Sequence, residues 1–154
     1  MSVMDRIRAA GIVLPAAEIP KALYVPYTLH HGLLTVSGQL PLQNGKPILV
    51  GTVPDAVTVE AAQDAARLCL ANMLGWVGAA VEGDFERIRG VVRVGGYVAV
   101  KPGVNDAPQV INAASELLNR IFEERGRHAR VAMGVASLPF GAPVEIEATF
   151  ALDA

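Results

Sequence analysis

The sequence predicts an α+β fold in which a mixed β-sheet is covered on one face by two helices, in the order ββ(β)αβαββ. Two segments carry apolar residues at spacings of three and four, as amphipathic helices do. Segments rich in β-branched residues surround them. At 154 residues the chain has the usual size of one domain, and no linker rich in Gly, Pro or Ser divides it. We therefore predict a single domain spanning residues 1–154.

The N-terminal extension covers residues 1–19. A short helix is expected over 2–10, and Gly11 ends it. This segment lacks the continuous apolar stretch of a signal peptide. The only cysteine, Cys69, excludes an internal disulfide and fits a reducing compartment. We expect a cytoplasmic protein.

Three strands are expected next. Residues 22–30 and 32–40 are rich in Leu, Val, Tyr and Thr and flank His31-Gly32, so they predict an antiparallel pair. Residues 47–53 lie between prolines and predict a short edge strand, because proline is tolerated mainly at sheet edges. We interpret His30 and His31 as solvated side chains, with a place in a cleft as the alternative.

The first long helix is expected to run from Thr58, a favourable N-cap, to Gly83. Cys69 is expected to serve packing, and Trp76 to lie in the core or at an interface. Residues 86–101 follow with many valines and predict a long strand. One apolar stripe repeats along the helix: Ala62, Ala66, Cys69, Leu70, Met73, Val77 and Val81.

The second helix is expected to open near residues 105–108, with proline in its first turn, and Gly126 suits its C-terminal end. Two strands, 129–138 and 143–152, complete the sheet. With both helices on one face, the other face must meet water or another subunit. The buried stripe of the helix consists of Val110, Ala114, Leu117, Ile121 and Phe122.

The composition favours another subunit, rather than water, as the partner of the uncovered sheet face. Hydrophobic residues make up 52% of the chain and charged residues 18%, against about 25% charged residues in an average domain. Excess apolar surface can be buried between subunits, since obligate interfaces resemble a core cut in half. We therefore expect an oligomer. No apolar run is long enough for a membrane span, so we expect no membrane partner.

Several other classes of site are disfavoured. The formal net charge is −2 and no run of Lys or Arg occurs, so we expect no nucleic-acid partner. The motifs GxGxxG, P-loop, CxxC, HExxH and GxSxG are absent, and we expect no cofactor. The three histidines have no cysteine or acidic partner at matching spacing, so we expect no metal site.

Some polar residues interrupt the apolar segments. Glu145 and Glu147 alternate with apolar residues and project from one face of a strand, while Asn112 lies in an apolar helix turn. One interpretation leaves the glutamates on a solvated sheet face and Arg130 at a strand end. In the other interpretation, Arg130 binds the carboxylate of a ligand in bidentate fashion, because its planar guanidinium matches the carboxylate geometry. His128 would share its face if the strand extended that far.

The C-terminal part of the chain resembles the RidA/YjgF family, also described as L-PSP endoribonuclease-like. The resemblance lies in an arginine strand at 129–131, a Leu-Pro turn at 138–139 and a terminal VEIEA strand at 144–148. Two N-terminal segments, Pro26-Tyr27 and the VSGQLP of 36–41, resemble the family as well. Together the motifs extend over nearly all of residues 20–152.

One branch of that family, described as chorismate-mutase-like, resembles this chain further. The shared features are the N-terminal extension, Tyr24-Val25-Pro26 and the NAAS segment at 112–115. Other positions depart from the family pattern. Val25 stands where many members have glycine, and Ala132 stands where a cysteine is common. The resemblance therefore implies a pocket wall that differs from theirs.

The resemblance implies a homotrimer with a chorismate-mutase-like fold and clefts between subunits for a small carboxylate. In deaminating members, the arginine matching Arg130 holds the carboxylate of a 2-imino acid. The glutamate matching Glu145 positions or activates the water that releases ammonia. The remaining matched pocket positions are Tyr27, Ser37, Gly38 and Asn112.

We therefore expect a trimer that hydrolyses 2-imino acids to 2-keto acids and ammonia, since this reaction needs little beyond orientation, a bound carboxylate and water. A non-catalytic metabolite sensor is the alternative. A ribonuclease is a weaker alternative, because the acidic balance of the chain disfavours RNA binding.

A simple hairpin would hold Arg130 and Glu145 roughly 20 Å apart. Their convergence needs an intervening strand, a different pairing or a neighbouring subunit.

Overall fold

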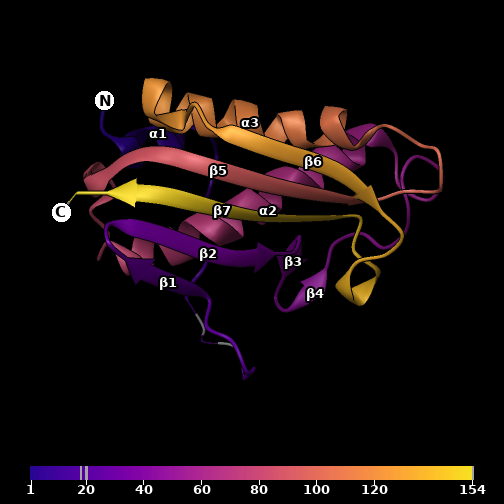
Figure 1. Cartoon of the computed structure of the whole chain (residues 1–154), viewed down its shortest axis with the longest axis horizontal. Coiled ribbons are helices and arrows are strands. Elements are labelled where there is room, and N and C mark those ends of the chain that lie inside the picture. Colours follow the sequence, from indigo (N-terminus) through magenta and orange to yellow (C-terminus); the bar gives the residue numbers. More distant parts are fainter. Residues whose placement is uncertain (18, 20, 154) are drawn as a thin grey trace.

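The computed structural model describes residues 1–17, 19 and 21–153. Its main sheet has the strand order β1-β2-β7-β5-β6, and the helices lie behind it in Figure 1. All neighbouring strands are antiparallel except β5 and β6, which are parallel. The predicted mixed α+β sheet is confirmed. The strands are β1 (Tyr27–His30), β2 (Leu33–Gln39), β5 (Ile88–Ala99), β6 (Ala129–Val135) and β7 (Val144–Leu152).

The predicted helices are confirmed as α1 (Val3–Ala9), α2 (Val59–Ala80) and α3 (Ala107–Phe122). Ser2 and Asp5 form a capping box at α1, and the Thr58 hydroxyl accepts a hydrogen bond from the Ala61 amide at α2. Within the described residues, no helix combines the length and apolarity needed to cross a membrane.

The core lies between the sheet and the helices. Along β7, buried residues alternate with partly exposed ones, as a strand with one covered face requires. Phe150 of β7 meets Phe122 of α3 with ring centroids 6.2 Å apart. Cys69 is fully buried in α2, which confirms its packing role. The covered face of β7 consists of Val144, Ile146, Ala148, Phe150 and Leu152.

Two strand predictions near the N-terminus were wrong in extent or position. The strand expected over 22–30 begins only at Tyr27. The ladder with β2 ends there, where the Ser37 amide donates to the Pro26 carbonyl at 2.8 Å. Pro26 has no N–H with which to continue the pairing.

Of the edge strand predicted over 47–53, only Pro47 lies in a strand, and Val53 makes an isolated bridge to Val100. A small hairpin precedes it instead, made of β3 (Leu42–Gln43) and β4 (Lys46–Pro47). Its turn residues Asn44 and Gly45 have φ of 52° and 75°. Positive φ at both positions fits a type I′ turn, for which Asn-Gly is the strongest sequence signal.

The helix predicted up to Gly126 ends earlier, at Phe122. Glu123 adopts a φ of 56°, which breaks the α-helical repeat, and a 3-10 turn, η2 (Glu123–Gly126), follows. The strand predicted over 86–101 is also shorter than expected: the turn η1 (Phe85–Arg87) takes its first residues, and β5 spans Ile88–Ala99. These boundaries bring Arg127 and His128 to the start of β6.

Candidate functional site

Arg130 lies on the edge strand β6 and points to the helix-covered side of the sheet. Its Nη1 donates to Asn112 Oδ1 at 2.8 Å and to Ser115 Oγ at 3.2 Å, both on α3. Within the described residues no carboxylate pairs with this guanidinium. Its other N–H groups are therefore available for an anionic ligand, which a guanidinium can bind in bidentate fashion.

A hydrogen-bonded chain orients Arg130 from behind. His128 Nδ1 lies 2.6 Å from the Gly126 carbonyl oxygen, and His128 Nε2 lies 3.0 Å from Ser115 Oγ. A carbonyl only accepts, so Nδ1 carries the proton in neutral imidazole and Nε2 accepts from the Ser115 hydroxyl. The lone pairs of Ser115 Oγ are then free to face Arg130.

Sequence reasoning assigned no role to Ser115. Its spacing from Asn112 was the available signal, because residues three apart lie on one helix face. His128 does share the face of Arg130, although β6 begins one residue later, at Ala129.

A hollow of about 320 Å³ adjoins Arg130. It lies between α3 and the start of β6, and all of its lining side chains are polar or cationic. The hollow is therefore suited to an anion. Its lining residues are Asn112, Ser115, Asn119, Arg127, His128 and Arg130.

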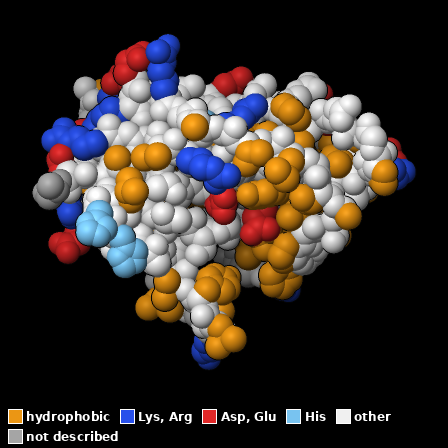
Figure 2. Space-filling model, in the orientation of Figure 1, with side chains coloured by type: hydrophobic (Ala, Val, Ile, Leu, Met, Phe, Trp, Pro, Cys, Tyr) orange, Lys and Arg blue, Asp and Glu red, His pale blue; other side chains and the backbone are white. Residues whose placement is uncertain are grey.

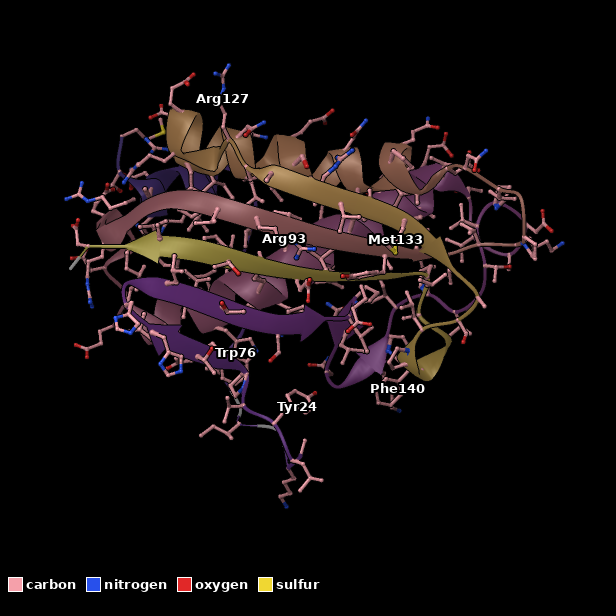
Figure 3. All side chains as sticks on the ribbon, in the orientation of Figure 1. Tyr24, Trp76, Arg93, Arg127, Met133 and Phe140 are labelled. Carbon is pink, nitrogen blue, oxygen red and sulfur yellow. The ribbon has the colours of Figure 1, made fainter. Side chains whose placement is uncertain are left out.

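Glu147 lies on the open face of the sheet, as one of the two interpretations of the sequence has it, and has partners there. Its Oε1 accepts from Arg93 Nη1 at 2.8 Å and from the Tyr97 hydroxyl at 3.2 Å. Desolvation and the Glu147 charge raise the pKa of Tyr97. Figure 3 places Arg93 near the middle of this face. Glu147 thus belongs to a surface ion-pair network.

Glu145 lies on the same open face but has no ion pair or hydrogen-bond partner among the described residues. Burial, and secondly the charge of Glu147, raise the pKa of its carboxyl group. A Cβ added to Gly38 would overlap Glu145 Oε1. The pairing of β2 with β7 is irregular between Val36 and Gln39, around this contact.

Tyr27 lies on the face of the sheet opposite that carboxylate, and the Ser37 hydroxyl bonds to the segment before β1. The Ser37 hydroxyl donates to the Val25 carbonyl at 2.7 Å and fixes the segment that enters β1. Tyr27 pairs in register with the buried Val36, so its side chain faces the helix layer. There it lines a cavity of about 440 Å³ with Trp76 and Val25.

The strand β5 separates Arg130 from Glu145. In register, Arg130 neighbours Val94, which neighbours Ala148 of β7. The intervening strand allowed by the sequence is therefore present, but the two side chains point to opposite faces of the sheet. Two strand spacings alone amount to about 10 Å. Arg130 and Glu145 do not meet within one chain.

The chain is similar to known proteins in both sequence and structure. A family model described as "YjgF/chorismate mutase-like, putative endoribonuclease" matches residues 4–146. The chain belongs to this family. It is 40% identical to the protein TCP17 of Trypanosoma cruzi over 98% of this chain and 94% of that protein.

Solved structures of family relatives share the fold. The Atu1372 protein of Agrobacterium tumefaciens, of unknown function, matches with a TM-score of 0.90 and 44% identity, over 99% of this chain and 92% of that one. The structure of E. coli TdcF with bound serine matches with a TM-score of 0.57 and 28% identity, over 92% and 94% of the two chains.

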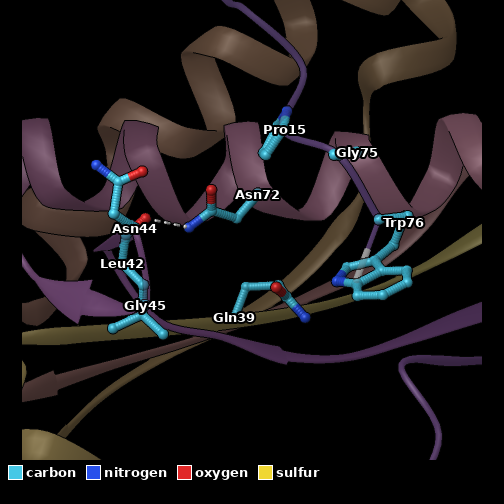
Figure 4. Close-up of a pocket in the computed structure, with 10 residues that line it drawn as sticks. Pro15, Gln39, Leu42, Asn44, Gly45, Asn72, Gly75 and Trp76 are labelled. Atoms are coloured by element: carbon cyan, nitrogen blue, oxygen red, sulfur yellow. Dashed lines mark hydrogen bonds between the residues drawn. The ribbon is translucent and has the colours of Figure 1, made fainter. Parts of the chain in front are cut away.

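Another cavity of this YjgF-family chain, of about 460 Å³, lies between the N-terminal segment and α2 (Figure 4). Trp76 and Pro15 line it. Asn72 uses its side-chain amide to donate to the carbonyls of Leu40 and Leu42, each at 3.0 Å. This amide therefore ties the β3 hairpin to α2. Among the described residues, no group of three His, Cys, Asp or Glu side chains could hold a metal ion.

Proposed function

We propose that three copies of this chain form a trimer whose clefts bind a small carboxylate and hydrolyse 2-imino acids to 2-keto acids and ammonia. The observation that carries the proposal is the placement of Arg130 and Glu145 on opposite faces of one sheet. A neighbouring copy that packs its sheet edge against the open face supplies the missing partner. Each cleft then takes Arg130 from one subunit and Glu145 from the next.

The character of the open face supports assembly. Leu33, Val92 and Met133 are 45%, 44% and 45% exposed on three different strands. Figure 2 shows hydrophobic side chains gathered over one end of this face, beside charged residues. Phe140 extends that end of the molecule and is 67% exposed (Figure 3). Apolar surface of this kind marks interaction sites.

The polar groups support a small carboxylate as ligand. Arg130 is held by two neutral acceptors of α3 and keeps its charge uncompensated by the described residues. The relative TdcF has been solved with bound serine, itself a small carboxylate. A bidentate contact with the ligand carboxylate would leave the imine carbon displayed to the open side of the cleft.

Glu145 supplies the base in this proposal. Its carboxylate takes a proton from a water molecule as the water oxygen bonds to the carbon of the protonated imine, whose C=N electron pair moves to the nitrogen. Glu145 returns that proton to the amino group of the resulting carbinolamine, the C–N bond breaks and ammonia leaves with the electron pair. The hydroxyl proton passes to Glu145 and on to solvent as the oxygen becomes the keto group. Burial raises the pKa of Glu145, which makes the carboxylate a stronger base and helps it hold the proton between the two steps.

A trimer that binds a carboxylate without turnover is the second candidate. This candidate is favoured by the direction of the Tyr27 side chain, which faces α2 and not Glu145. Glu145 therefore has no orienting partner among the described residues of its own subunit. RNA cleavage has less support, because a chain of net charge −2 offers little attraction to a polyanion.

Ammonia release separates these candidates. Imino acids are generated in the assay by an amino-acid oxidase acting on small, aliphatic and aromatic amino acids, and light scattering reports the mass of the protein. Enzyme function predicts trimer mass and faster ammonia release with at least one imine, lost in Arg130→Ala. Intact ligand binding without acceleration for any imine would leave the binding protein. A monomer at micromolar concentration would contradict both.

A further inference from the structure

The hollow beside Arg130 offers more positive charge than one carboxylate requires. Its volume of about 320 Å³ lies at the lower end of the range of about 300–1,000 Å³ for small-molecule sites. Arg130 alone can bind one carboxylate in bidentate fashion. The same hollow is also lined by Arg127 and Asn119, and neither aspartate nor glutamate lines it among the described residues.

Arg127 is held only loosely where it stands. Its Nη1 lies 3.5 Å from Glu124 Oε2, and the two side chains are 77% and 85% exposed. An ion pair this exposed contributes little free energy, so the guanidinium can turn to a ligand at small cost. Figure 3 shows Arg127 at the α3 edge of the molecule, outside the sheet.

Asn119 extends the polar lining along the helix. It lies four residues after Ser115 on α3, and therefore one turn further along the same face. Arg130 bonds to Asn112 and Ser115, and Gly126, the chain neighbour of Arg127, lies against Asn119, so this row of polar residues leads from Arg130 toward Arg127. A ligand anchored at Arg130 can thus follow this row and place a second acceptor group beside Arg127.

We propose that this pocket takes a small acid with two anionic groups, of the dicarboxylate class. Arg130 holds the first carboxylate, and Arg127 with the Asn119 amide holds the second. The inference rests on the proposed function, because it uses Arg130 as the anchor. It goes further by naming the substrate class and a specificity residue, Arg127.

Two ligands of the same shape test the charge of the second group. 2-Oxoglutarate carries two carboxylates, and 5-methyl-2-oxohexanoate replaces the second with an isopropyl group. Titration calorimetry of the full chain should find 2-oxoglutarate binding about tenfold tighter or more, since a charge-assisted hydrogen bond contributes about that much. Arg127→Gln should bring its affinity down to that of the monoacid and leave the monoacid unchanged.

Two further variants sharpen the comparison. Glu124→Gln frees Arg127 from its ion pair and should tighten 2-oxoglutarate alone. Arg67→Gln removes an equal charge from α2, where Arg67 pairs with Asp64, and should change neither ligand. Equal loss of both ligands in Arg127→Gln would contradict a specific contact with the second carboxylate.

The outcomes separate this inference from the proposed function. Equal affinity for the two ligands, with both lost in Arg130→Ala, would overturn the dicarboxylate inference and keep Arg130 as a carboxylate anchor. Binding of both ligands unchanged in Arg130→Ala, or no binding to the unmodified protein, would overturn the anchor and the inference together.

Discussion

Gly38 and Glu145 are in direct contact across the β2–β7 pair: the glutamate carboxylate occupies the space that a side chain at residue 38 would fill. The backbone of one strand therefore sets where the carboxylate of the next strand lies. Gly38 does not have a positive φ. The reason for glycine here is space for Glu145 rather than backbone conformation.

Gly38→Ala should therefore displace the Glu145 carboxylate with little effect on folding. The overlapping atom is the end of a flexible side chain, which can move away. We expect ammonia release to fall about tenfold or more, while carboxylate binding at Arg130 is retained. Gly90→Ala is the matched control, since its added Cβ would make only an ordinary contact at 3.7 Å. Unchanged turnover in Gly38→Ala would argue against Glu145 as the base.

Arg130→Ala should remove the stabilisation of the fold by a bound carboxylate. Titration with benzoate, followed by melting temperature, should show a rise for the unmodified chain and none for the variant. Loss of a desolvated, bidentate charge pair should cost about 2–5 kcal/mol of binding free energy. Because Arg130 is exposed on an edge strand, the variant should still fold. The same ligand-induced rise in both proteins would show that the anchor lies elsewhere.

Ser115→Ala should weaken binding by misorienting Arg130. The variant removes one of two acceptors of Nη1 and breaks the link to His128. A hydrogen bond of this kind contributes about 1 kcal/mol, so benzoate affinity should fall about fivefold. Ser115→Thr keeps the hydroxyl and should restore affinity. Equal affinities for the alanine variant and the unmodified chain would limit Ser115 to packing.

Glu145→Gln should change the pH dependence of stability. Burial raises the pKa of Glu145 in the folded state above its unfolded value, so the folded state binds this proton more tightly. The free energy of unfolding therefore falls as pH rises from the ordinary carboxyl range through the raised pKa. Glutamine lacks this loss. Urea unfolding should find the variant gaining stability relative to the unmodified chain between pH 4 and pH 7.

Glu116→Gln controls for loss of a carboxylate, because Glu116 is exposed on α3. A gain for Glu145→Gln that is equally large at pH 4 and pH 7 would contradict the burial of this carboxylate.

The fold could be predicted from the sequence wherever periodicity and caps agreed. The apolar stripe after Thr58 predicts α2, and the alternation from Val144 predicts β7 with Glu145 and Glu147 on one face. The strand expected over 47–53 rested on the prolines that bound it, whereas the Asn44-Gly45 turn places a hairpin at 42–47 instead. Local turn chemistry determined that segment.

The site was predicted less completely. Family motifs indicate Arg130 and Glu145, yet no pattern says that β5 lies between them or that they face opposite sides. Those facts depend on the pairing of strands distant in sequence. The link from Ser115 to His128 was equally inaccessible, because it depends on where η2 ends and β6 begins.

A mixing experiment tests most directly whether Arg130 and Glu145 act together across a subunit boundary. Arg130→Ala and Glu145→Gln chains are each assayed alone, then unfolded together in equal amounts and refolded, with mixed assembly checked by native mass spectrometry. In a random mixture about a quarter of the clefts combine an intact Arg130 with an intact Glu145 from different chains. Ammonia release should then recover to about a quarter of the unmodified rate. Mixed assemblies no more active than either variant alone would contradict the shared site.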